Sequence, residues 1–229
     1  MNHLSEYVEL MTSRESMYRF LGRLYFVEVD ENLFDQLKKM IFPSETGVDE
    51  MDEGYRLLKN YMNNAGLDPI TDLAVDYARV FLGAGVYEGT VANPYESVYT
   101  SPERLIMQDA RDEVLAAYLS KGLAVETDYN IPEDHISLEF EFMAHMCAEA
   151  KGALEDKNWA GFGESLAEQK EFLHNHLLNW VPDFCKDIET CSSTDFYQGL
   201  AKLTMGYLQI EKELLDELHE EILTGSADI

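Results

Sequence analysis

Apolar residues recur at the three- and four-residue spacing of an α-helix along most of this chain, and no segment alternates polar and apolar residues as a strand does. The clearest example runs from Ile131 to Glu149, where Leu138, Phe142 and Met146 lie four positions apart. Pro132 suits the first turn of this helix, because its missing N–H would have no partner there. The sequence therefore predicts an all-α fold, a bundle of about eight to ten helices without a solenoid repeat.

Proline, glycine and short polar runs divide the helical pattern into segments. Pro43 is expected to end the second helix and Gly83 the fourth, since neither residue continues a helix readily. Pro182 follows the expected end of a later helix, and residues 43–53 and 83–101 are predicted loops. The pattern over residues 4–27 predicts either one helix or two. The predicted helical segments cover residues 4–27, 31–41, 54–64, 70–82, 102–120, 131–149, 159–180 and 194–223.

The length and a polar connector bear on the domain organisation. A chain of 229 residues with 46% hydrophobic content can bury one core or two. Residues 122–134 form a short polar connector between two helical segments, which is the composition expected of a boundary or hinge. We therefore predict an N-terminal helical domain over residues 1–124, a hinge over 125–134 and a C-terminal helical domain over 135–229.

The charge of the chain restricts its partners. Asp and Glu together number 44 against 17 Lys and Arg, and the formal net charge is -27. A surface of this sign repels nucleic acid and anionic membranes, so we expect no nucleic-acid partner and favour a basic one. The same charge can serve solubility alone, and composition leaves both explanations open.

Targeting signals and cysteine pairs are not evident in the sequence. No run of about 18 apolar residues is present, and the acidic N-terminus is unlike an export signal. We therefore expect a cytoplasmic protein without stable membrane insertion. Cys147, Cys185 and Cys191 show no CxxC spacing, which favours reduced thiols over disulfides or a structural zinc site.

Metal and nucleotide chemistry find little support in the pattern of residues. His135, Glu139 and His145 share one helix, but a carboxylate-bridged metal centre needs two Glu-x-x-His units, and only Glu171 to His174 forms one. The glycines that follow Gly83 come after a helix and lack a phosphate-binding spacing. No nucleophile has a recognisable base beside it. We expect no metal, no cofactor and no catalytic residues, with a helical metal- or nucleotide-dependent enzyme as the alternative.

The predicted loop 83–101 is rich in glycine, proline and tyrosine. Long segments without regular structure are uncommon in compact domains and often carry function. Tyr87, Pro94, Tyr95 and Tyr99 concentrate apolar and amphipathic surface there. The rings either pack the loop onto the core or line a groove for a peptide, and both interpretations are consistent with the sequence.

Three segments together are similar to those of a known family. They are Tyr77-Ala-Arg-Val-Phe-Leu-Gly83, Asn93-Pro-Tyr-Glu-Ser-Val-Tyr99 and Pro132-Glu-Asp-His135, the last followed by an apolar helix. In order and spacing they resemble the motifs of the TorD-, DmsD- and NarJ-type redox-enzyme maturation chaperones. The resemblance covers nearly the whole chain. Some members of the family have tryptophan where this chain has tyrosine, a departure that bears on which client is bound.

The resemblance implies a cytoplasmic chaperone that is not an enzyme. Members of the family bind the twin-arginine signal peptide on the catalytic subunit of a molybdenum oxidoreductase, and assist cofactor insertion and proofreading before export. It also implies a hinge before Pro132, which permits either a monomer or a domain-swapped homodimer. The peptide-binding residues implied by the motifs are Tyr77, Val80, Phe81, Pro94, Tyr95, Ser97, Tyr99, Pro132, Asp134 and His135.

Overall fold

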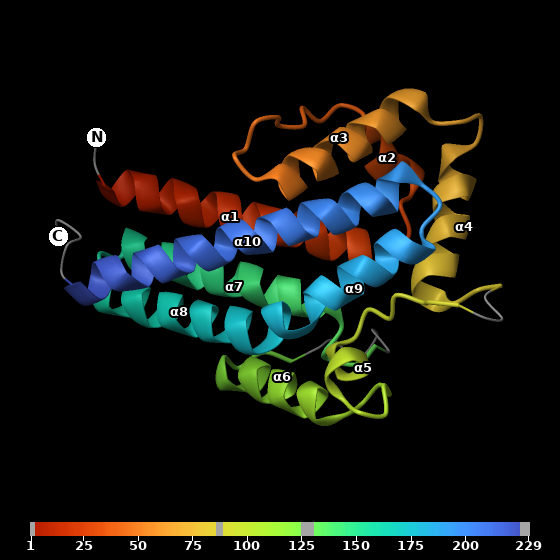
Figure 1. The fold of residues 1–229 in the computed structure, drawn as a ribbon. Coiled ribbons are helices and arrows are strands. Elements are labelled where there is room, and N and C mark those ends of the chain that lie inside the picture. Colours follow the sequence, from red (N-terminus) through yellow and green to blue (C-terminus); the bar gives the residue numbers. More distant parts are fainter. Residues whose placement is uncertain (1–2, 86–88, 125–130, 225–229) are drawn as a thin grey trace. The chain divides into compact units, whose positions relative to one another are not determined.

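A computed structural model describes residues 3–85, 89–124 and 131–224 (Figure 1). Over these residues the chain forms α-helices and one π-helical turn, with no strand, which confirms the predicted all-α fold. None of the helices in this part combines the length and apolar character needed to cross a membrane. The elements are α1 (His3–Phe26), α2 (Glu31–Leu37), α3 (Asp49–Asn64), α4 (Pro69–Leu82), α5 (Glu96–Thr100), α6 (Asp109–Ser120), α7 (Ile136–Glu155), α8 (Trp159–Phe172), η1 (Leu173–Leu177), α9 (Leu178–Cys191) and α10 (Asp195–Thr224).

The chain divides into two compact units. Unit 1 contains Met1–Arg23, Tyr95–Asn179 and Glu211–Ile229, and unit 2 contains Leu24–Pro94 and Trp180–Ile210. Each unit draws on segments from both sides of the hinge that the sequence predicts over 125–134. Residues 125–130 of that hinge lie outside the described residues, so the division at this point stays a prediction.

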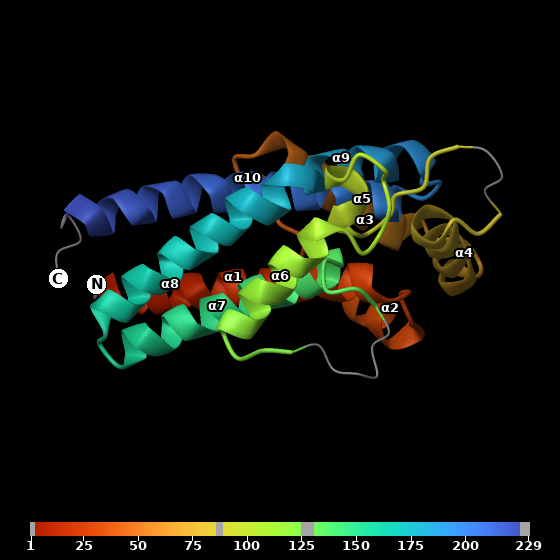
Figure 2. The same cartoon turned by 90° about the horizontal axis from the view of Figure 1, so that it is seen from below.

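Unit 1 is built around α7 and α8, which lie side by side in both views of the fold (Figure 1 and Figure 2). α7 buries most of its circumference, including Phe140, Met143 and Ala150. The Phe140 ring contacts Tyr18 of α1, with ring centroids 5.8 Å apart. The broad apolar stripe of the 131–149 segment therefore faces the core of unit 1, as its pattern indicates.

Unit 2 has an aromatic core and a close contact between two helices. The rings of Tyr25, Phe81 and Phe184 contact one another, with centroids 5.5 to 6.0 Å apart. α3 approaches α10 so closely that a Cβ added at Gly54 would lie 2.8 Å from the carbonyl oxygen of Gly199. Real Cβ atoms do not make such contacts, so glycine is what allows the two backbones to meet.

Three predicted helix starts are wrong. α7 begins at Ile136 rather than residue 131, so Pro132 lies before this helix and not in its first turn. α3 begins at Asp49 rather than residue 54, because three acids near its start favour the positive end of the helix dipole. The helix predicted to start at Pro102 begins instead at Asp109. Arg104 and Met107 have φ values of 52° and 62°, a left-handed conformation that prevents a continuous helix over the intervening residues.

Two further predictions fail where local signals were misleading. The predicted loop 83–101 contains the short helix α5. The helix expected to stop before Pro182 continues to Cys191, with the proline inside it. Since η1 ends at Leu177 and α9 starts at Leu178, Pro182 lies only about one turn into α9, where its missing N–H removes a single hydrogen bond.

Candidate functional site

His135 caps the N-terminus of α7. Its Nδ1 accepts the backbone N–H of Ser137 at 3.1 Å and lies 2.7 Å from the Ser137 hydroxyl, which satisfies one of the free donors of the first turn. The imidazole is only 4% exposed and meets the Tyr95 ring edge-on, with centroids 5.1 Å apart. Burial lowers the pKa of His135 to about 3, so the ring is neutral at physiological pH.

Asp134 joins the start of α7 to α5. The carboxylate is fully buried, and its Oδ2 accepts the backbone N–H of Ser97 at 2.8 Å. The carbonyl of Asp134 accepts the N–H of Glu96 at 3.0 Å, and Tyr95 pairs with His135 in an isolated antiparallel β-bridge. The Pro-Glu-Asp-His motif is therefore fixed against the first turn of α5 through both its backbone and its side chains.

Glu96 extends this junction to the π-helical turn. Its carboxylate Oε2 lies 2.9 Å from Nδ1 of His176 in η1, and both side chains are buried. Burial raises the pKa of Glu96, and the hydrogen bond from His176 opposes that rise. The Glu96 side chain also shares a hydrogen bond with the Glu139 side chain of α7, which requires a proton on one of the two carboxyl groups. One buried polar cluster thus connects α5, α7 and η1.

Glu133 connects the motif to α6. Arg111 forms a bidentate ion pair with the Glu133 carboxylate. A terminal guanidinium nitrogen lies 2.8 Å from Oε1, and Nε of Arg111 donates to Oε2. The Tyr118 hydroxyl donates to the Glu133 carbonyl at 3.1 Å. Two-pronged arginine pairs fix geometry as well as charge, so α6 has a defined position on the motif.

Six of the ten predicted peptide-binding residues fall in unit 1. Asp134, His135 and Ser97 are buried, whereas Tyr95, Tyr99 and Pro132 are partly exposed. Tyr95, Tyr99 and Pro132 are therefore the members of this group that keep some exposure to solvent. The structure brings Tyr95 and Ser97 together with Asp134 and His135, and the Arg104 guanidinium lies over the Tyr99 ring at 5.4 Å.

The other four predicted residues, Tyr77, Val80, Phe81 and Pro94, fall in unit 2, and all are buried. The Tyr77 hydroxyl donates to the carbonyl of Tyr25 at 3.0 Å, and its ring contacts Phe81 at 4.9 Å. In the structure these side chains pack in the core of their unit. Tyr87 of the predicted loop lies outside the described residues.

Sequence reasoning missed Glu96 and His176 as members of the cluster. Glu96 follows Tyr95 in what was predicted as a loop, and a buried acid there leaves no periodic signal. His176 lies 80 positions away, so nothing local links the two residues. Among the described residues, no group of three or more His, Cys, Asp or Glu side chains is placed to hold a metal ion.

In the described all-α fold, the Pro-Glu-Asp-His helix start is fixed to the tyrosine-containing segment, so two of the three motifs that resemble those of redox-enzyme maturation chaperones lie together. A family profile described as nitrate reductase delta subunit matches residues 48–186. The chain is 32% identical over 156 residues to the chaperone protein TorD of Vibrio cholerae, covering 67% of each chain. It is 26% identical over 213 residues to TorD of Shewanella loihica, covering 89% of this chain and 93% of the relative.

A third relative, TorD of Photobacterium profundum, is 22% identical over 218 residues, covering 93% of this chain and 98% of its own. The protein therefore belongs to the nitrate reductase delta subunit family of TorD- and NarJ-type maturation chaperones. It is a chaperone and not an enzyme. The resemblance inferred from the three motifs is confirmed.

Proposed function

We propose that this protein is a cytoplasmic chaperone that binds the twin-arginine signal peptide on the catalytic subunit of a molybdenum oxidoreductase. By holding the leader it assists insertion of the cofactor and proofreads the precursor before export. The observation that carries the proposal is the family match over residues 48–186, together with relatives named as TorD chaperones. The net charge of -27 supports it, because it suits a ligand with a basic head.

The partly exposed face of unit 1 gives the proposal a physical form. The rings of Tyr95 and Tyr99 and the side chain of Pro132 offer amphipathic surface to the apolar middle of a leader. Asp134 and His135 are buried and hold this surface in place through Ser97 and the helix cap. We assign the exposed rings to peptide contact and the buried groups to positioning.

The four buried motif residues of unit 2 have a supporting role in the same proposal. We still propose that the four residues contribute to peptide binding: Tyr77, Val80, Phe81 and Pro94. Because they are buried, they contribute by packing the segment that carries them and not by direct contact with the peptide. Truncating these side chains would destabilise the core of unit 2, so a loss of binding in such variants would not show that they contact the peptide.

Calorimetric titration with a synthetic twin-arginine leader tests the proposal. We expect saturable binding to the wild-type protein that weakens with salt, because surface acids attract the basic head. Tyr95→Ala should weaken binding by about tenfold or more, the loss typical of an aromatic anchor. Leu67→Ala, which truncates a fully exposed apolar side chain in unit 2, is the matched control and should leave affinity unchanged. A leader ignored by the wild-type protein at low ionic strength would refute the proposal.

We also propose that the assembly is either a monomer or a homodimer that exchanges its C-terminal helices around the hinge predicted over 125–134. The two assemblies differ twofold in mass. Light scattering on the purified protein distinguishes them, and a mass that fits neither one chain nor two would contradict both.

A further inference from the structure

A hollow of about 270 Å³ opens in unit 1 between α6, α7, α8 and η1, outside the residues assigned so far to peptide contact. Pockets for drug-sized ligands are usually larger, about 300–1,000 Å³, so this one suits a single side chain. Its lining combines aromatic and charged groups, among them Phe142, Phe172, Lys121, Glu168, Glu171 and His176.

The apolar part of the pocket is formed by two phenylalanines. The rings of Phe142 and Phe172 pack edge to face at an interplanar angle of 63°, with centroids 4.8 Å apart. Phe172 also lies against the His176 imidazole, with centroids 4.7 Å apart. Aromatic faces attract cations, and the planar guanidinium of arginine stacks on them better than an ammonium does.

The charged part of the pocket already holds a cation from the same chain. Nζ of Lys121 pairs with Glu168 and lies 3.0 Å from Oε2 of Glu149. Burial lowers the pKa of Lys121, but the two carboxylates outweigh burial and the net shift is upward. Glu171 lies three residues after Glu168 on the same face of α8, is exposed, and forms no ion pair within the described part of the chain. A second positive group therefore has a free carboxylate to bind.

His176 supplies a hydrogen-bond acceptor from the wall of the pocket. The residue is only 8% exposed, and its Nδ1 lies 2.9 Å from the Glu96 carboxylate. In the neutral tautomer that carries its proton on Nδ1, Nε2 holds a lone pair, and no residue that the structure describes forms a hydrogen bond to Nε2. Guanidinium is donor-only, with five N–H groups, so this acceptor suits it.

We infer that the pocket between Phe172, Glu171 and His176 binds the guanidinium of an arginine side chain from the leader peptide. The inference rests on the proposed function, and it assigns the arginine to a site apart from the Tyr95 surface. The guanidinium stacks on the Phe172 ring, pairs with the free Glu171 carboxylate and donates to Nε2 of His176. A neutral side chain of equal length satisfies neither the carboxylate nor the aromatic face.

The site also connects to the Pro-Glu-Asp-His motif. His176 bonds to Glu96, and the Glu96 N–H bonds to the Asp134 carbonyl at 3.0 Å. A bound arginine therefore contacts the same buried polar cluster that fixes α5 against α7.

A double-mutant cycle between peptide and protein tests the inference. The titrant is a leader peptide with its arginine pair, or the same peptide with both arginines replaced by glutamine. Glu171→Gln should weaken binding of the arginine peptide about tenfold and leave the glutamine peptide unaffected. Glu164→Gln is the matched control, since Glu164 is an exposed acid on the same helix outside the pocket. It should change both affinities less than twofold.

The outcomes separate this inference from the proposed function. Equal losses for Glu171→Gln and Glu164→Gln, while the wild-type protein binds the leader tightly, would overturn the pocket assignment and leave leader binding intact. Equal losses for both peptides in Glu171→Gln would also overturn it, because the effect would not depend on arginine. Failure of the wild-type protein to bind either peptide would overturn both proposals.

Discussion

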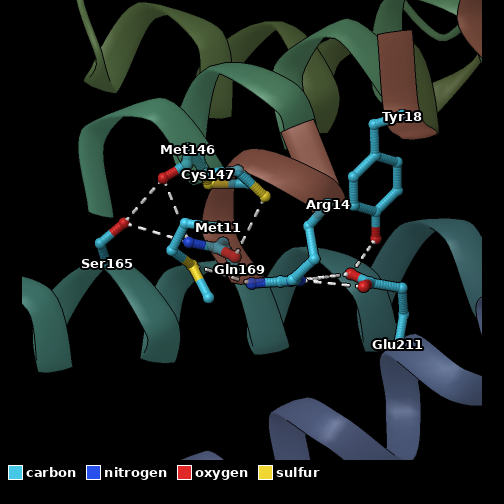
Figure 3. A network of polar contacts seen from close by, with 8 residues as sticks. All are labelled: Met11, Arg14, Tyr18, Met146, Cys147, Ser165, Gln169 and Glu211. Atoms are coloured by element: carbon cyan, nitrogen blue, oxygen red, sulfur yellow. Dashed lines mark hydrogen bonds and ion pairs between the residues drawn. The ribbon is translucent and has the colours of Figure 1, made fainter. Parts of the chain in front are cut away.

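Arg14 of α1 and Glu211 of α10 are 197 positions apart in the chain and form a two-pronged ion pair inside unit 1 (Figure 3). Nε of Arg14 lies 2.9 Å from Oε1 and a terminal nitrogen 2.7 Å from Oε2. The Tyr18 hydroxyl donates to the same carboxylate at 2.7 Å. Both charged side chains are almost completely buried, so each charge depends on the opposite charge of its partner to offset the loss of hydration.

The first prediction concerns this ion pair. Glu211→Gln removes the negative charge but keeps the shape, leaving the Arg14 charge buried and uncompensated. Breaking a buried pair in this way costs about 3–5 kcal/mol, and we expect the free energy of unfolding to fall by that amount. Urea denaturation followed by circular dichroism measures it. Glu217→Gln, an exposed acid on the same helix, should change stability by no more than about 0.5 kcal/mol. Similar values for the two variants would contradict the role given to the pair.

The second prediction compares two helical glycines. Gly54→Ala would place its Cβ 2.8 Å from the Gly199 carbonyl oxygen, so α3 and α10 must separate. We expect a loss of about 1–3 kcal/mol, the usual cost of overpacking. Gly152 of α7 has nothing within 4 Å of an added Cβ, and Gly152→Ala should stabilise the protein by about 0.5–1 kcal/mol. Thermal melts of both variants measure the two shifts, and shifts of the same sign would be inconsistent with the packing of unit 2.

The fold could be predicted from the sequence wherever a helix has a regular apolar face. α4 and α10 begin and end within a residue or two of their predicted bounds. The errors occur where a local sequence signal is overridden by tertiary packing, which the sequence does not show. Pro182 predicts the end of a helix, but α9 follows directly on the π-helical turn and continues through this proline.

The site could be predicted only in part. His135 was expected at the mouth of a helix, and it caps α7 there. Its contact with Tyr95 joins two motifs that the family resemblance had already placed in the same site. The pairing of Glu96 with His176 could not be predicted, because it depends on helix packing across 80 residues of sequence.

The third prediction concerns pH. Burial lowers the pKa of His135 from 6.5 to about 3, so the folded protein keeps the ring neutral over a range in which the unfolded chain takes up a proton. The free energy of unfolding should therefore fall as the pH drops from 7 to 4, with this group contributing about 3 kcal/mol of the loss. His135→Asn keeps an N-cap acceptor but does not titrate. Urea denaturation at several pH values should show a smaller loss in the variant, whereas identical losses in both proteins would rule out this histidine as the source.

The fourth prediction concerns Asp76, a buried acid of α4 that sequence reasoning did not single out. Its carboxylate accepts the backbone N–H of Thr194 at 2.8 Å and the Thr194 hydroxyl at 2.6 Å, and it also accepts the N–H and hydroxyl of Ser193. These donors directly precede α10, so the negative charge lies where the helix dipole favours it.

Asp76→Asn preserves the size of this side chain but turns one acceptor oxygen into a donor that faces other donors. We expect the free energy of unfolding to fall by at least about 2 kcal/mol, since hydrogen bonds to a charged group are lost and buried donors are left unpaired. Asp72→Asn, an exposed acid in the first turn of the same helix, should cost less than about 1 kcal/mol through the helix dipole alone. Hydrogen exchange should show faster exchange of the Thr194 amide in the Asp76 variant only. Unchanged protection there would mean that the carboxylate does not hold the start of α10.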